Sequence, residues 1–246
     1  RRILHMALPL GVSESLRAGL NTIESLIVPQ RLSLHAGTVD AIAGYGIVCG
    51  MVFPVLMFPS AILFSLADLL VPELSRCRKG GPRPPYLAKR GLRVSLLFGL
   101  WAGGFLFSAA GPLGEILYHN EAVSFSLRLY APLVPVLYMD AIVDAMCKGL
   151  GQQGANARYN LFTSLLDVLI LWLLLPHYGL GGYYLSFAVT HLLNFALSLR
   201  RLVLVSGVQL SAGPAVRAAM AAAAAAWIAG MLPVWETPLG GAVFAG

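Results

Sequence analysis

Apolar residues run through this chain in long blocks that are separated by short polar or glycine- and proline-rich breaks. A helix that crosses the hydrocarbon core of a bilayer needs about 20 predominantly apolar residues. A window of that length predicts seven membrane-spanning helices and the start of an eighth, truncated one near residue 238. The seven windows lie near residues 3–29, 44–72, 93–117, 127–148, 160–177, 181–199 and 214–235.

The breaks between the windows carry strong turn signals. They are richest at 79–85 (KGGPRPP), 149–154 (GLGQQG) and 176–182 (PHYGLGG). The second window is unusually long and contains Pro54 and Pro59. Proline inside a membrane helix predicts a kink at which neighbouring helices satisfy the freed backbone groups.

Composition supports a membrane protein. Hydrophobic residues make up 58% of the 246 residues and charged residues only 11%, whereas soluble domains carry about 25% charged residues. The mean hydropathy is +0.76. The expected fold class is therefore an all-α, polytopic transmembrane helix bundle. The chain opens on Arg1 directly before an apolar run and stops at Gly246 inside another, so we expect a piece of a longer protein.

The cysteine pattern suggests no special chemistry. The three cysteines are odd in number and widely spaced, so they indicate neither a disulfide framework nor a zinc site. We expect Cys49, Cys77 and Cys147 to be small core residues.

Basic residues predict the orientation of the chain. With the N-terminus in the cytoplasm, 14 of the 17 lysines and arginines fall in cytoplasmic segments, as the positive-inside rule requires. The densest cluster lies at 76–93, where binding of nucleic acid or anionic lipid is an alternative reading. No aromatic residues alternate with the basic ones as nucleic-acid binding would favour, and a topology signal is sufficient to explain the cluster. We expect no nucleic-acid partner.

The first window contains polar residues at membrane depth. Glu14, Arg17, Asn21 and Glu24 are spaced by three, four and three residues, which places them within an arc of about 80° on a helix. Each charge at the bilayer centre costs about 2.5–3.5 kcal/mol on insertion scales. This face must therefore look into protein or a hydrated cavity. It is either a structural polar seam or a cavity wall that meets a polar substrate.

Other windows carry polar residues at helical spacing. Asp140 and Asp144 lie one turn apart, with Lys148 one turn further, and two such carboxylates raise each other's pKa. We consider them a possible ion or proton site, whereas Lys148 and Asp68 lie near helix ends and can reach the interface. A possible polar seam comprises Asn160, Asp167, His191 and Asn194, with Asn156 and Thr163 on the same face as Asn160.

Motifs of catalysis are missing from the sequence. There is no HExxH, GxSxG or P-loop pattern, and the glycine-rich stretch at 149–154 joins two membrane windows. We expect neither an enzyme nor a bound metal or cofactor.

The order of several short motifs resembles the stage V sporulation protein B family, over about residues 3–205. The resemblance is carried by CKGLGQQG at 147–154, ARYN at 157–160, LPHYGLGGY at 175–183, SLRRL at 198–202, YG at 45–46, GM at 50–51, FPS at 58–60 and LVPELS at 70–75.

This resemblance implies a fold and a function. The family belongs to the superfamily of multidrug, oligosaccharidyl-lipid and polysaccharide exporters, which have two six-helix bundles of the MATE-like type. The chain would then hold the second bundle at 1–205 and truncated additional helices at 206–246. Its partners would be the bilayer of a bacterial cell membrane, a lipid-linked oligosaccharide and the N-terminal lobe of the same protein. Glu14, Arg17 and Glu24 would lie where such flippases line their central cavity.

Three functions are consistent with these observations. The first is a lobe of a flippase that moves lipid-linked saccharides, such as peptidoglycan precursors, by alternating access. The second is a cation-coupled multidrug or solute antiporter of the same fold, with Asp140 and Asp144 binding the coupling ion. The third is a non-transporting scaffold in cell-wall or spore assembly.

Overall fold

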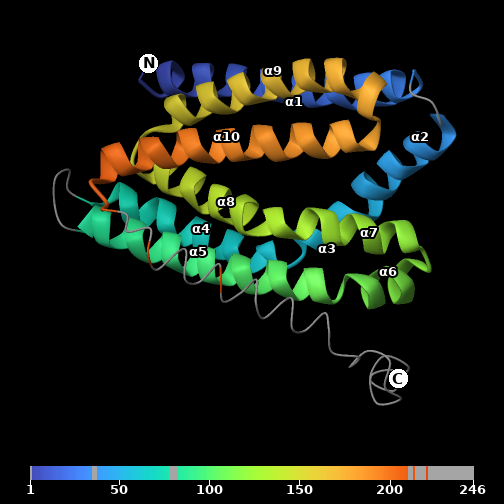
Figure 1. Cartoon of the computed structure of the whole chain (residues 1–246). Helices are drawn as coiled ribbons and strands as arrows, with labels where there is room; N and C mark the ends of the chain where they lie inside the picture. The colour runs from blue at the N-terminus through green and yellow to red at the C-terminus, as the bar shows by residue number, and fades with distance from the viewer. Residues whose placement is uncertain (1, 35–37, 78–82, 210–212, 214–219, 221–246) are drawn as a thin grey trace, which may run out of the picture.

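The described chain is helical throughout, with no strand among the residues that the structure covers (Figure 1). The computed structural model describes residues 2–34, 38–77, 83–209, 213 and 220, and for residues 2–14, 17, 38 and 39 it describes the backbone alone. The predicted all-α membrane bundle is confirmed. The helices are α1 (Arg2–Leu32), α2 (Thr38–Ile47), the π-helical η1 (Val48–Val52), α3 (Phe53–Met57), α4 (Ser60–Ser75), α5 (Arg83–Ser108), α6 (Ala110–Tyr118), α7 (Glu121–Tyr130), the 3₁₀ turn η2 (Ala131–Leu133), α8 (Val134–Gly149), α9 (Gln153–Tyr178) and α10 (Leu180–Ser206).

Five helical segments among the described residues are long and apolar enough to cross a bilayer. The polar residues of α1 keep that helix outside this group, although it is long enough to span. The window at 214–235, the segment from residue 238 and nearly all of the region 206–246 lie outside the described residues. The five segments are Asp40–Met57, Arg83–Ser108, Glu121–Gly149, Gln153–Tyr178 and Leu180–Ser206.

Several helices extend beyond their apolar windows. Helix α5 begins at Arg83, inside the predicted break at 79–85, because proline is accommodated in the first turn of a helix, where Pro84 and Pro85 lie. The predicted break at 176–182 is also too wide. Helix α9 runs to Tyr178, and the turn is made at Gly179, whose φ of 54° is easily reached only without a side chain. Hydropathy detects the lipid-embedded part of a helix and misses ends that extend into the interface.

The second window is bent, as its prolines predict. The π-helical η1 precedes Pro54, and the helix is interrupted again at Pro59 before α4 begins. Figure 1 shows α2 running at an angle to α4. The buried Tyr138 of α8 donates its hydroxyl to the carbonyl of Leu56 at 2.7 Å, just before the second interruption. A neighbouring helix thus satisfies a backbone group beside the break.

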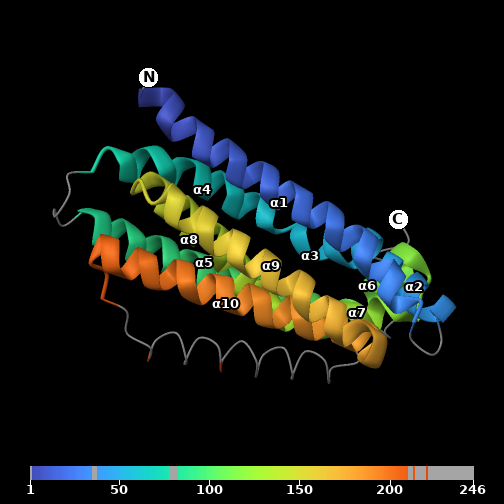
Figure 2. The ribbon, with the colours of Figure 1, turned by 90° about the horizontal axis from the view of Figure 1, so that it is seen from above.

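Helix α8 lies at the centre of the bundle. It packs against α4, α5 and α10, α10 packs against α9, and α9 packs against α1 (Figures 1 and 2). The contact between α5 and α8 is close because α5 presents glycine there. A Cβ at Gly99 would lie 2.8 Å from Cα of Pro135, and one at Gly103 would lie 3.0 Å from the carbonyl oxygen of Ala131. Small residues allow membrane helices to approach in this way.

Helix ends gather at two opposite ends of the bundle. One end holds the N-terminal end of α1, the C-terminal end of α4, the N-terminal end of α5, the connection between α8 and α9 and the C-terminal end of α10 (Figure 1). These are the segments that the basic residues assign to one side of the membrane. The assignment of that side to the cytoplasm stays a prediction.

Candidate functional site

A stripe of polar side chains on α10 meets α9. Ser186, Thr190 and Asn194 are spaced by four residues and therefore lie on one face of α10. The hydroxyls of Ser186 and Thr190 both donate to Oδ1 of Asp167 on α9, at 2.6 and 3.2 Å. Asp167, one of the residues of the predicted seam, is thus tied to α10 by two hydrogen bonds.

Asn194 connects three helices. Its Nδ2 donates to Oδ2 of Asp140 on α8 at 3.1 Å. Its Oδ1 accepts a hydrogen bond from the hydroxyl of Thr163 on α9 at 3.4 Å. The seam therefore continues from the α9–α10 contact onto α8.

The two carboxylates of α8 have separate amide partners. Asp140 accepts from Asn194, whereas Asp144 accepts from Nδ2 of the buried Asn156 at 2.8 Å. Both aspartates are half-buried. The structure thus ties each of them to another helix by a hydrogen bond, and their use as an ion or proton site stays a prediction.

The two other predicted members of the seam have different surroundings. The half-buried Asn160 accepts a hydrogen bond on its backbone carbonyl from the Thr163 hydroxyl, at 3.1 Å. The ring of His191 stacks on Phe187 with centroids 3.9 Å apart, and its Nδ1 lies 2.9 Å from the Phe187 carbonyl oxygen. Phe187 also stacks on Phe53. His191 therefore belongs to an aromatic cluster beside the seam.

The polar face of α1 divides between the interior and the outside. Val28 and Leu32 are fully buried where α1 packs on α9. Glu24 lies one turn before Val28 and is half-buried. Asn21 is exposed. Glu24 therefore lies beside the contact with α9, whereas Asn21, about 60° away around the helix, is not covered by the described bundle.

The two remaining polar residues of this face, Glu14 and Arg17, lie within helix α1, and their side chains are outside the described part of the structure. Arg17 is seven residues before Glu24, which places both positions on the same side of the helix.

Near its C-terminal end, α1 is held to α9 by an aromatic contact. The guanidinium carbon of Arg31 lies 4.1 Å from the ring centroid of Trp172 on α9. Cation–π contacts of this kind contribute about 0.5–1 kcal/mol at exposed sites. The contact connects α1 to the bundle at the end opposite the basic cluster.

Sequence reasoning missed part of the seam. Ser186 and Thr190 were not singled out, although their spacing of four residues from Asn194 is a usable signal. Gln152 was also missed. Its Oε1 accepts from Nε and Nη2 of Arg201 at 2.9 and 2.5 Å, which ties the α8–α9 turn to α10. No local pattern joins Gln152 to Arg201, because the two residues are far apart in the sequence.

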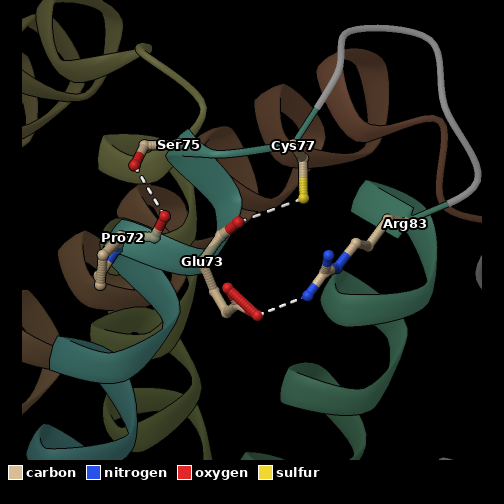
Figure 3. A network of polar contacts seen from close by, with 5 residues as sticks. All are labelled: Pro72, Glu73, Ser75, Cys77 and Arg83. Carbon is tan, nitrogen blue, oxygen red and sulfur yellow. Dashed lines mark hydrogen bonds and ion pairs between the residues drawn. The ribbon is translucent and has the colours of Figure 1, made fainter.

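The cysteines only partly fit the predicted core role. Cys147 is buried, but Cys77 is half-buried and Cys49 is exposed, with its Sγ 4.0 Å from the hydroxyl of Tyr183. The core prediction for Cys49 is wrong, since Val48 and Val52 occupy the buried positions of η1. The Cys77 thiol donates to the carbonyl of Glu73 at 3.2 Å (Figure 3).

Comparison with known proteins gives two relatives, both from Bacillus subtilis (strain 168). Stage V sporulation protein B is 27% identical over 161 residues, which cover 64% of this chain and 31% of that protein. Sporulation protein YkvU is 24% identical over 178 residues, covering 71% of this chain and 40% of that protein. The chain is a relative of these sporulation proteins. It spans well under half of the length of either one.

Neither of two further comparisons adds a relative. No family model matches the chain, and no solved structure matches it. The relationship therefore rests on the two sporulation proteins, and it supports the resemblance seen in the motifs.

Proposed function

We propose that this chain is one lobe of a membrane transporter that flips a lipid-linked saccharide across the bilayer by alternating access. The polar headgroup passes through a hydrated interior while the lipid tail stays in the hydrocarbon. The lobe performs no covalent chemistry and binds no cofactor. The relationship to two sporulation proteins supports a role in assembly of the cell envelope or spore, where lipid-linked saccharides are used.

The placement of α1 carries this proposal. The helix lies at the edge of the described bundle, packed on α9, with Asn21 exposed and Glu24 half-buried in its middle. Polar groups at membrane depth are stable only against protein or water. A second lobe facing α1 across a water-filled cavity provides both.

Arg17 is the proposed contact for the headgroup. Its position shares a side of α1 with Glu24. The planar guanidinium forms paired hydrogen bonds to phosphate oxygens, which suits the pyrophosphate of a lipid-linked precursor. The exposed Asn21, one turn after Arg17 on the same face of the helix, is the proposed contact for sugar hydroxyls.

The test is transport by the full-length protein in cells depleted of their own flippase. We expect the unaltered protein to restore flipping of the lipid-linked precursor and Arg17→Ala to abolish it. Arg128→Ala is the matched control, because Arg128 is exposed on α7 and outside the proposed cavity. Full activity of Arg17→Ala overturns the headgroup assignment. Failure of the unaltered protein to flip overturns the flippase itself.

A cation-coupled antiporter is the second candidate, favoured by the oxygen atoms that gather at Asp167. The hydroxyls of Ser186 and Thr190 both contact Oδ1 of Asp167, and the half-buried Glu24 lies on α1, which packs on the same helix α9. Carboxylate and hydroxyl oxygens together can hold a cation or a shared proton. The sequence reasoning placed such a site at Asp140 and Asp144.

Two substitutions distinguish these sites. Asp167→Asn is expected to remove the dependence of transport on a cation or proton gradient, whereas Asp144→Asn is expected to preserve it. If Asp144→Asn removes this dependence and Asp167→Asn preserves it, the coupling site is at Asp140 and Asp144 on α8. A silent Arg17→Ala together with loss of ion-dependent efflux of a small solute favours the antiporter over the flippase. Loss of protein partners without any transport defect supports the scaffold.

A further inference from the structure

Helix α5 has two different sides. Its inner side packs closely on α8 through Gly99 and Gly103. Its outer side exposes large apolar side chains, with Leu97 49% and Trp101 64% accessible. Because α5 is long and apolar enough to cross a membrane, we take this outer side to face lipid acyl chains.

The same outer side changes character in the first turns of α5. Tyr86, Arg90 and Arg93 are exposed, and at 100° per residue they share an arc of about 80° with Leu97 and Trp101. Arg90 donates from Nη1 to the hydroxyl of Tyr86 at 3.4 Å. One continuous surface therefore passes from apolar residues to a tyrosine and two arginines at the end of the bundle where basic residues gather.

Among the described side chains, Arg90 and Arg93 form no ion pair. The pair formed by Glu73 and Arg83, 2.6 Å apart, is the only ion pair among the residues for which side chains are described (Figure 3). This ion pair occupies Glu73, the acidic residue near the C-terminal end of α4 that lies next to the start of α5. Arg90 and Arg93 therefore have no carboxylate partner within the described part of the chain.

We propose that Tyr86, Arg90 and Arg93 form a binding site for the headgroup phosphate of an anionic phospholipid. The guanidinium groups bind the phosphate oxygens, and Tyr86 lies at the depth of the headgroups, where aromatic residues are enriched. The acyl chains lie along Leu97 and Trp101. Arg93 precedes Trp101 by eight residues, or about 12 Å along the helix, which is within the thickness of one leaflet.

A lipid explains this surface better than a soluble polyanion. The arginines share their side of the helix with the lipid-facing Leu97 and Trp101, so a molecule bound to them is in contact with the bilayer. A topology signal requires basic residues at this end but does not require them on the lipid-facing side. The position of Arg90 and Arg93 on the same side of α5 as Leu97 and Trp101 therefore favours a lipid.

Trp101 provides a direct test. The chain, with its other three tryptophans replaced by phenylalanine, is reconstituted into vesicles that contain brominated phosphatidylglycerol or brominated phosphatidylcholine in an otherwise fixed mixture. Quenching of Trp101 measures which lipid occupies the surface. We expect the anionic lipid to be enriched several-fold over the zwitterionic one, because each basic residue near an anionic leaflet favours binding by roughly fivefold.

Matched variants locate the effect. Arg90→Gln with Arg93→Gln is expected to lower the enrichment at Trp101 to near one. Arg158→Gln with Arg200→Gln removes the same charge from exposed residues at the same end of the bundle and is expected to leave the enrichment unchanged. Equal loss in both double variants overturns the site in favour of a diffuse field. Equal quenching by the two lipids in the parent chain overturns the proposal altogether.

Discussion

Helices α8 and α1 both carry acidic and polar residues at helical spacing, but the fold uses them differently. On α8, Asp140 and Asp144 each accept a hydrogen bond from an asparagine of another helix. About half of the membrane-spanning segment that contains α8 is buried by neighbouring helices. On α1, Asn21 is exposed at the edge of the same bundle. The difference is that α8 has neighbours on several sides, whereas α1 packs mainly on α9.

This comparison separates polar residues that hold a bundle together from those that are available to something outside it. A hydrogen-bonded polar group inside a membrane protein is a structural contact. A polar group on the open side of an edge helix requires water, a substrate or a second lobe. The proposed transport function therefore rests on α1, and the rigidity of the lobe rests on α8.

The largest expected effect comes from filling a close contact with α8. Gly99→Ala places a methyl group 2.8 Å from Cα of Pro135, and we expect a loss of about 1–3 kcal/mol in stability. Gly19→Ala on α1 meets nothing within 4 Å and is expected to be neutral or stabilising by up to about 1 kcal/mol. Unfolding of the purified protein in detergent measures both. Equal destabilisation by the two substitutions contradicts the contrast between the helices.

A smaller effect is expected from removing one amide from each region. Asn156→Ala removes the hydrogen bond from Asn156 to Asp144, and we expect a loss of about 0.6 kcal/mol, the average for such bonds in a membrane bundle, and of at most about 1.7 kcal/mol. Asn21→Ala is expected to change stability by less than about 0.5 kcal/mol while lowering transport. If Asn156→Ala is as stable as the unaltered protein, or if Asn21→Ala transports at an unchanged rate, α8 and α1 do not have the separate structural and transport roles described above.

The smallest effect concerns the attachment of α1 to α9. Arg31→Gln removes the cation–π contact with Trp172, which we expect to reduce stability by about 0.5–1 kcal/mol and to increase hydrogen exchange at the C-terminal end of α1. Arg128→Gln, an exposed arginine on α7, serves as the control and is expected to leave exchange in α1 unchanged. Unaltered hydrogen exchange in Arg31→Gln would show that the contact with Trp172 does not hold α1 against α9.

The sequence predicts the helices well and their ends poorly. Apolar windows locate every described span, and Pro54 and Pro59 locate the bend in the second one. The start of α5 at Arg83 and the start of α9 at Gln153 are missed. Hydropathy depends on burial in lipid, whereas helix ends depend on capping and on proline geometry in the first turn.

The polar residues illustrate a second difference. Helical spacing groups Asn160 with Asp167 on α9 and His191 with Asn194 on α10, because residues three, four or seven apart share a face. It cannot separate His191, which stacks on Phe187, or find the contact of Gln152 with Arg201. Those outcomes depend on which helices are neighbours.

By itself, the sequence determined that this chain is an all-α membrane protein with most of its basic residues at one end, because the bilayer imposes helix length and charge distribution on any chain that crosses it. Only the tertiary structure decided which polar residues are paired and which remain open. Pairing requires two helices to meet at one level. The packing of α8 at the centre and α1 at the edge decides this, and no local pattern in the sequence encodes it.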